Sequence, residues 1–173
     1  MDLCEFHAKI LQLYKMLYLV NNKFKEDFMK ENFELCEHIY EDAEMACYTI
    51  EELIKDLKDK NNKIKRLLED ILKEYTSYKE DAKKELDKNG MEIDEKGPVS
   101  KMMAGMGIKK EVKSDNSDSS IAQMLIEGIS MGSLNTERKI NDFDKDVNKD
   151  HIKFAKEFLK FQEKSISELK KYL

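Results

Sequence analysis

Apolar residues return every three or four positions along most of this chain, and that spacing places them on one face of an α-helix. The 173 residues include 1 Pro and 6 Gly, so few positions interrupt a helix. No run of alternating β-branched residues in the sequence indicates a strand. The sequence therefore predicts an all-α fold made of long amphipathic helices.

The order of the expected helices predicts the architecture. A first helix lies within residues 1–22, where Asn21-Asn22 ends or bends it, and it adds an N-terminal helix to the rest. Two helical hairpins follow, at residues 33–88 and 119–173, because each contains two helices with a short link. The four helices of these hairpins are expected at residues 33–58, 62–88, 120–143 and 148–173.

Residues 89–118 join the two hairpins and are expected to form a long crossover loop. They show no clear helical period and include Gly97-Pro98. A connection of this length can span a helix of about 40 Å, in which case the helices before and after it run parallel. This connectivity predicts an antiparallel four-helix bundle with one long crossover, as in ferritin-like folds, plus the extra N-terminal helix.

Four stretches of the sequence carry a resemblance to known proteins: EDAEMACYTIEELIKDLKD, LLEDILKEYTSYKEDAKKEL, SDSSIAQMLIEGISMGSLN and KFQEKSISELKKYL. Over residues 33–173 the chain resembles uncharacterised small bacterial proteins with ferritin-like helical bundles. The resemblance consists of helix-packing patterns. It implies a fold and no established activity.

The composition narrows the classes of function. The formal net charge is -5 at pH 7, whereas nucleic-acid binding usually requires a basic face. No apolar run approaches the roughly 20 residues of a membrane span, and the start of the sequence lacks the basic segment of a secretory signal. The 3 Cys suit a reducing compartment. We therefore expect a cytoplasmic protein with neither nucleic acid nor membrane as a partner.

A ferritin-like bundle could hold a di-metal carboxylate site, which uses inward glutamates and Glu-x-x-His pairs. None of the 3 His has a Glu three positions before it. Glu34, His38 and Glu41 remain as weak candidates for metal ligands, and a solvated helix face explains them more simply. No catalytic or nucleotide-binding motif is present in the sequence. The sequence thus favours a protein without metal, cofactor or enzymatic activity.

Four polar side chains fall on otherwise apolar helix faces: Tyr75, Tyr78, Asn135 and Gln162. If buried, polar groups need partners, so these residues are predicted to share a buried network that fixes the helix register, or else to line a small-ligand site. The third alternative is that some are exposed because a helix end frays or a helix face is misassigned. Gly128 and Gly132 lie one turn apart within a helix, where each costs about 1 kcal/mol relative to Ala. We interpret them as positions of close helix contact.

Two helices also carry apolar residues outside their inner faces: Ile126, Ile129 and Ile140 in one, and Phe154, Phe158 and Phe161 in the other. Apolar second faces of this kind are normally covered. The cover could be the N-terminal helix, the last helix or a second subunit. We favour the second subunit, which predicts a non-enzymatic interaction or structural module that self-associates as a homodimer. The alternatives are a ferritin-like metal-binding protein and a regulatory bundle that binds a small ligand.

Overall fold

The structure is a computed structural model and describes residues 3–58, 60–91, 115–142 and 148–173. They form α1 (Leu3–Asp56), α2 (Lys65–Lys88), α4 (Asp118–Asp142), α5 (Lys149–Leu169) and the short 3-10 helix η1 (Lys170–Tyr172). These residues contain no strand, so the all-α prediction is confirmed for them. No helix in the same residues is long and apolar enough to cross a membrane.

The chain divides into two compact units, residues 1–34 and residues 35–173. The division falls within α1, so this helix contributes to both units. In its described residues the first unit consists of the first part of α1. The second unit contains the rest of α1 together with α2, α4, α5 and η1.

Helix α1 continues through Asn21-Asn22, where the sequence pattern predicted an end or a bend. Inside a helix, Asn costs at most about 0.7 kcal/mol relative to Ala, far less than Pro. The residues that follow, KFKEDFMKE, are mostly good helix formers. The boundary expected at residue 22 is therefore absent, and residues before and after it belong to one helix.

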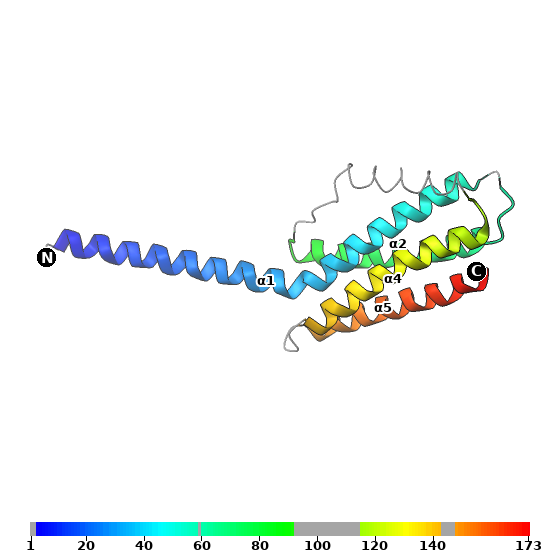
Figure 1. Ribbon diagram of the computed structural model, residues 1–173. Coiled ribbons are helices and arrows are strands. Elements are labelled where there is room, and N and C mark those ends of the chain that lie inside the picture. The colour runs from blue at the N-terminus through cyan, green and yellow to red at the C-terminus, as the bar shows by residue number, and fades with distance from the viewer. Residues whose placement is uncertain (1–2, 59, 92–114, 143–147) are drawn as a thin grey trace. The chain divides into compact units, whose positions relative to one another are not determined.

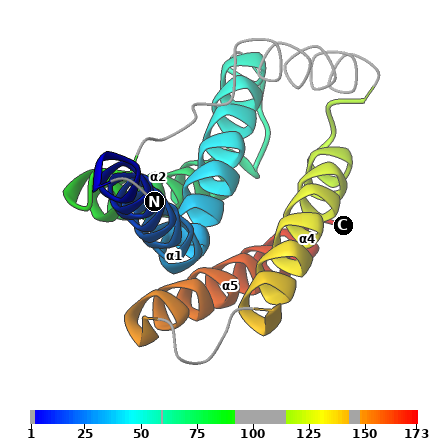
Figure 2. The ribbon, with the colours of Figure 1, turned by 90° about the vertical axis from the view of Figure 1, so that its left-hand side faces the viewer.

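The helices of the second unit pack as a bundle (Figure 1). The part of α1 after residue 34 and helix α2 run in opposite directions, joined by residues 57–64. Helices α4 and α5 form a second antiparallel pair, and Figure 2 shows them side by side. Helices α2 and α4 run in the same direction (Figure 1). Of the predicted crossover at 89–118, residues 92–114 lie outside the described residues.

Local chemistry explains several helix ends. Gly90 follows α2 with a φ of +69°, a left-handed conformation that glycine adopts at little cost. At the start of α5, the Asn148 side chain accepts a 3.1 Å hydrogen bond from the backbone N–H of Asp150. At the start of α4, the Ser117 hydroxyl accepts a 3.2 Å bond from the backbone N–H of Ser120. The Asn and Ser residues act as N-caps.

The turn between α1 and α2 is fastened to the start of α4 by one carboxylate. Asp118 accepts hydrogen bonds from Asn62 Nδ2 at 2.9 Å and from the backbone N–H of Lys63 at 3.0 Å. An acidic residue in the first turn of a helix is also favourable for the helix dipole. Asp118 thereby fixes the first turn of α4 against the first hairpin.

Aliphatic side chains at the predicted spacing fill the core of the bundle. Fully buried examples are Leu35, Ile39, Ile50, Leu53, Leu57, Leu68, Leu86, Ile121 and Leu169. Burying one such side chain contributes about 1.5–3 kcal/mol. Polar side chains are buried among them at Thr136, His151, Gln162 and Ser165. Buried polar groups require hydrogen-bond partners, so the surroundings of these four side chains are the place to look for a functional site.

Candidate functional site

A carboxylate–amide pair joins α1 to α5 inside the bundle. Gln162 is fully buried, and its Nε2 donates a 2.7 Å hydrogen bond to Asp42 Oδ2. Gly132 of α4 makes room for the pair, because a Cβ there would lie 2.9 Å from Asp42 Oδ2 and 3.0 Å from Gln162 Nε2. Gln162 Oε1 is buried with no hydrogen-bond partner among the described residues. The hydrogen bond between Asp42 and Gln162 therefore needs a glycine, which has no side chain, at position 132.

The side chain of Tyr75 from α2 lies beside this pair and is 1% exposed. Burial raises the pKa of the Tyr75 hydroxyl above its ordinary value. The negative charge of Asp42 raises this pKa further, while hydrogen bonding with Gln162 acts in the opposite direction. The phenol is consequently protonated near neutral pH and can donate a hydrogen bond.

A second polar contact joins α1 to α4 one turn away. The hydroxyl of Thr136, which is fully buried, donates a 3.0 Å hydrogen bond to the carbonyl oxygen of Gly132. His38 Nε2 lies 3.0 Å from the same hydroxyl oxygen. Since the hydroxyl proton is used by the carbonyl, His38 Nε2 is the donor in this contact. His38 precedes Asp42 by four residues and Thr136 follows Gly132 by four, so the two contacts stack along the helices.

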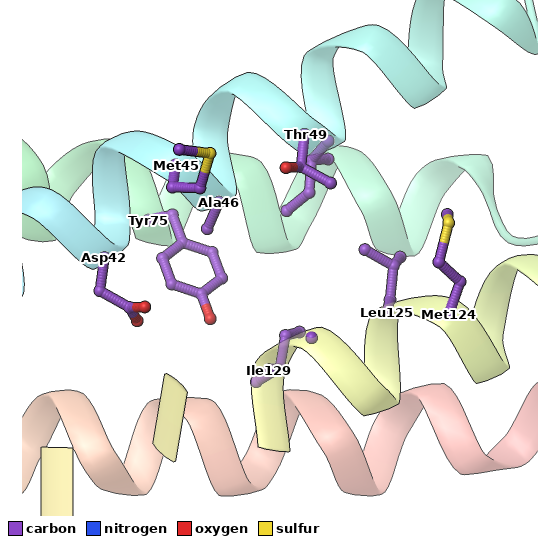
Figure 3. Close-up of a pocket in the computed structure, with 10 residues that line it drawn as sticks. Asp42, Met45, Ala46, Thr49, Tyr75, Met124, Leu125 and Ile129 are labelled. Atoms are coloured by element: carbon purple, nitrogen blue, oxygen red, sulfur yellow. The ribbon is translucent and has the colours of Figure 1, made fainter. Parts of the chain in front are cut away.

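A pocket of ≈ 130 Å³ opens next to the pair, between α1, α2 and α4 (Figure 3). Asp42 and Tyr75 form its polar end, and Figure 3 shows the carboxylate and the hydroxyl pointing toward the space between α1 and α4. Its apolar wall comprises Met45, Ala46, Ile50, Met124, Leu125 and Ile129, and Thr49 and Gly128 also line it. A concave apolar surface with a few polar groups is typical of a small-ligand site.

Helix α5 presents its phenylalanines to the tyrosines of α2. Phe158 is fully buried, with its ring centroid 5.9 Å from that of Tyr75 and 5.0 Å from that of Tyr78. Phe161 lies 4.8 Å from Tyr75, and Phe154 lies 5.7 Å from Tyr78. Edge-to-face aromatic pairs at such distances add about 0.5–1.5 kcal/mol beyond their buried area. The second apolar face of α5 is thus partly covered by α2, with Phe158 buried and Phe154 and Phe161 half-buried.

The second apolar face of α4 is also partly covered. Ile129 is buried, and Ile126 and Ile140 are half-buried. The exposed large apolar residues of α4 are Met131 and Leu134. The surface predicted from Ile126, Ile129 and Ile140 is therefore smaller than the sequence pattern suggested.

The polar residues predicted to form one network are arranged differently. Tyr75 and Gln162 are buried beside Asp42, whereas Tyr78 is half-buried against phenylalanine rings. Asn135 is exposed on α4, which corrects its predicted burial. The buried residue at this point is Thr136, because the inward stripe of α4 continues at steps of three or four through Leu125, Ile129, Gly132 and Thr136.

The two glycines of α4 have different surroundings. Gly132 is buried, and side chains of α1 and α5 approach it. Gly128 is exposed, and a Cβ there would meet nothing within 4 Å. The interpretation of Gly128 as a point of close helix contact is therefore wrong. This glycine borders the pocket instead.

Asp42 was missed by the sequence analysis, although the pattern contained a signal for it. It lies three residues after Ile39 and four before Ala46, which places it on the apolar stripe of α1. Charged side chains are rarely buried unless they are paired. This general rule argued against an inward-facing Asp42, although its spacing favoured one. Its hydrogen-bond partner Gln162 lies 120 residues later in the chain, so the local sequence does not reveal it.

The structure does not bring the three candidate metal ligands together into a metal site. Glu34 is exposed, Glu41 is half-buried, and His38 is hydrogen-bonded to Thr136. Within the described ranges, no three His, Cys, Asp or Glu side chains are grouped so that they could hold a metal ion. The geometry of this part of the chain thus offers no support for metal binding.

Two buried cysteines lie on α1. Burial raises the pKa of the Cys36 thiol to about 12, and the nearby carboxylate of Glu85 adds to the effect. Burial also raises the pKa of Cys47. The thiolate is the nucleophilic form of cysteine, and at neutral pH these two thiols are protonated. They act as small apolar side chains of the core.

Comparison of the chain with known protein families, curated proteins and solved structures found no match. No family or homologue therefore supports the resemblance to bacterial ferritin-like proteins. Any functional conclusion has to rest on the chain's own residues.

Proposed function

We propose that the protein is a non-enzymatic structural module that associates with a second copy of itself through the first part of α1. The observation that carries this proposal is a run of five large apolar residues, Met16 to Val20. Each is between 60% and 68% exposed. An exposed apolar run of this size is unusual on a monomer and typical of an interaction surface.

The sequence around this run favours a second helix of the same kind as the partner. Large apolar residues recur at alternating steps of three and four at Leu3, Phe6, Ile10, Leu13, Leu17 and Val20. Alternating steps of three and four are those of a coiled-coil seam, which matches another helix with the same period. Residues 3–20 make up about two and a half heptads, which is short of the three to four typical of a coiled coil. A second copy supplies the same repeat, which is why we commit to a homodimer.

Leu17 and Leu19 provide a matched test of this proposal. They are 66% and 65% exposed, and only Leu17 falls in the three–four repeat. We expect Leu17→Glu to raise the dimer dissociation constant at least about tenfold, because burying an unpaired carboxylate in a seam is costly. Leu19→Glu should leave the dissociation constant nearly unchanged. Light scattering coupled to size-exclusion chromatography, over a concentration series of the full chain, measures both.

Two results would contradict the proposal. The first is a wild-type chain that stays monomeric at high micromolar concentration. The second is an equal effect of both substitutions, which would indicate unspecific apolar association. Circular dichroism of each variant, compared with that of the wild type, controls for loss of helix.

We also infer that the bundle unit has the single-crossover connectivity of ferritin-like folds. The parallel course of α2 and α4 supports this inference (Figure 1). Two parallel helices that follow one another in the sequence require a long connection, and the chain has residues 89–117 available. An experimental structure with the chain traced through these residues tests the inference, and a connection that leaves α2 and α4 antiparallel would refute it.

A further inference from the structure

We propose that the pocket between α1, α2 and α4 binds a compact, uncharged apolar molecule of the size of a one-ring hydrocarbon. The proposal goes beyond self-association and does not depend on it. The residues that line the pocket all belong to the second unit, whereas the exposed run from Met16 to Val20 belongs to the first.

The pocket lies where α4 moves away from α1 over one helical turn. At position 132 of α4, a Cβ would lie 2.9 Å from Asp42 Oδ2 on α1. At position 128, one turn earlier, a Cβ would meet no atom within 4 Å. Gly128 borders the pocket and places no side chain in it. The space therefore results from the course of the two helices together with the glycine at position 128.

The wall of the pocket determines the class of the ligand (Figure 3). It is formed mainly by aliphatic and thioether side chains, namely Met45, Ala46, Ile50, Met124, Leu125 and Ile129. An apolar wall offers water few hydrogen bonds, and an unfilled space beside it forfeits dispersion contacts. An apolar molecule restores these contacts, and the methionine side chains can adapt to its shape. A charged group placed against the same wall would lose its water without gaining a partner.

The volume of the pocket sets the size of the ligand. The pocket measures ≈ 130 Å³, and an apolar cavity of about 150 Å³ accommodates benzene. The ligand should therefore have about six to eight non-hydrogen atoms. A single ring with one small substituent has this size.

The polar end of the pocket is consistent with an uncharged ligand. Asp42 accepts a 2.7 Å hydrogen bond from Gln162 Nε2, and it takes part in a further interaction besides this bond. The carboxylate thus has partners within the protein, and the ligand does not have to supply one. Tyr75 lines the same end with a phenol that is protonated near neutral pH, because burial raises its pKa.

Three probe molecules that share one ring test the proposal on the full-length chain. Toluene is uncharged, benzylamine carries an ammonium group and benzoate carries a carboxylate. By isothermal titration calorimetry we expect toluene to bind saturably at one site per chain, at least about tenfold tighter than either charged probe. Toluene should also raise the midpoint of thermal unfolding, since it binds only the folded chain. A charged probe that binds as tightly as toluene, or toluene that gives no saturable binding up to its solubility limit, would overturn the proposal.

Three variants then locate the site. Gly128→Leu places a side chain in the pocket from α4, and Ala46→Leu fills it from α1. Each should abolish toluene binding. Glu127→Leu is the matched control, because it introduces the same side chain at an exposed neighbouring position that does not line the pocket, and it should leave the affinity for toluene unchanged.

Two results with these variants would contradict the location of the site. The first is toluene binding that survives in both Gly128→Leu and Ala46→Leu. The second is an equal loss of binding in Glu127→Leu, which would indicate a general effect on α4. Circular dichroism shows whether each variant keeps its helix content, and if one of the two filling variants fails to fold, the other decides the matter.

Discussion

Replacing Phe158 by alanine is expected to lower the free energy of unfolding of the bundle by about 3–5 kcal/mol, the usual cost of a buried Phe→Ala substitution. Phe158 is 0% exposed and contacts the rings of Tyr75 and Tyr78 at centroid distances of 5.9 and 5.0 Å. The variant loses the buried area, leaves a cavity and removes both aromatic pairs. Urea unfolding followed by circular dichroism measures the change.

Two neighbours of Phe158 serve as controls for its variant. Phe161→Ala should cost less, since Phe161 is half-buried although it belongs to the same ring cluster. Lys160 is exposed, and its replacement by alanine should stay within about 0.5 kcal/mol. A cost for Phe158→Ala no greater than that for Lys160→Ala would mean that α2 and α5 do not pack through these rings.

This aromatic cluster illustrates how far the sequence predicts the packing. The spacing of Phe154, Phe158 and Phe161 correctly marks a second apolar face on α5. The spacing of Tyr75 and Tyr78 marks an inner face on α2. Periodicity gives the direction of a side chain relative to its own helix and says nothing about which helix lies opposite. The match between these faces therefore appears only in the tertiary structure.

Helix positions were predictable where the signal is local. The end expected at residue 88 and the start expected at residue 148 agree with α2 and α5 to within one residue, because capping depends on residues within one turn. The helix end predicted at Asn21-Asn22 was wrong, because no strong local signal ends the helix there. Asparagine disfavours a helix only weakly, so the residues around it decide whether the helix continues.

The candidate site was predictable only in part. Gln162 stands out as a polar residue on an apolar stripe, and Gly132 as a residue that a helix tolerates poorly. Their common partner Asp42 is charged, and charged residues on a helix are usually solvated. Asp42 is half-buried, and its hydrogen bond to the amide on α5 joins residues 120 positions apart in the sequence. Long-range pairs of this kind leave no trace in the local spacing.

The second large effect concerns the two glycines of α4. Leucine should lower the free energy of unfolding at Gly132 but not at Gly128. Both substitutions gain the helix propensity that glycine lacks, about 1 kcal/mol or less. At Gly132 the new Cβ would lie 2.9 Å from Asp42 Oδ2 and 3.0 Å from Gln162 Nε2, and the larger side chain overpacks the contact. We expect Gly132→Leu to lower the free energy of unfolding by about 1–3 kcal/mol. At Gly128, where a Cβ meets nothing within 4 Å, leucine should leave it unchanged or raise it slightly.

A double-mutant cycle identifies the source of the cost at Gly132. If a side chain there acts by displacing the Asp42–Gln162 hydrogen bond, Gly132→Ala combined with Asp42→Ala should cost less than the sum of the single variants. The coupling should be at least about 0.5 kcal/mol, the lower end for residues in contact. Additive costs would show that position 132 does not act through Asp42. Equal melting of Gly132→Leu and Gly128→Leu would show that α4 does not approach α1 and α5 at Gly132. The two helix glycines thus differ in role: Gly132 makes room for a half-buried carboxylate, and Gly128 borders an open pocket.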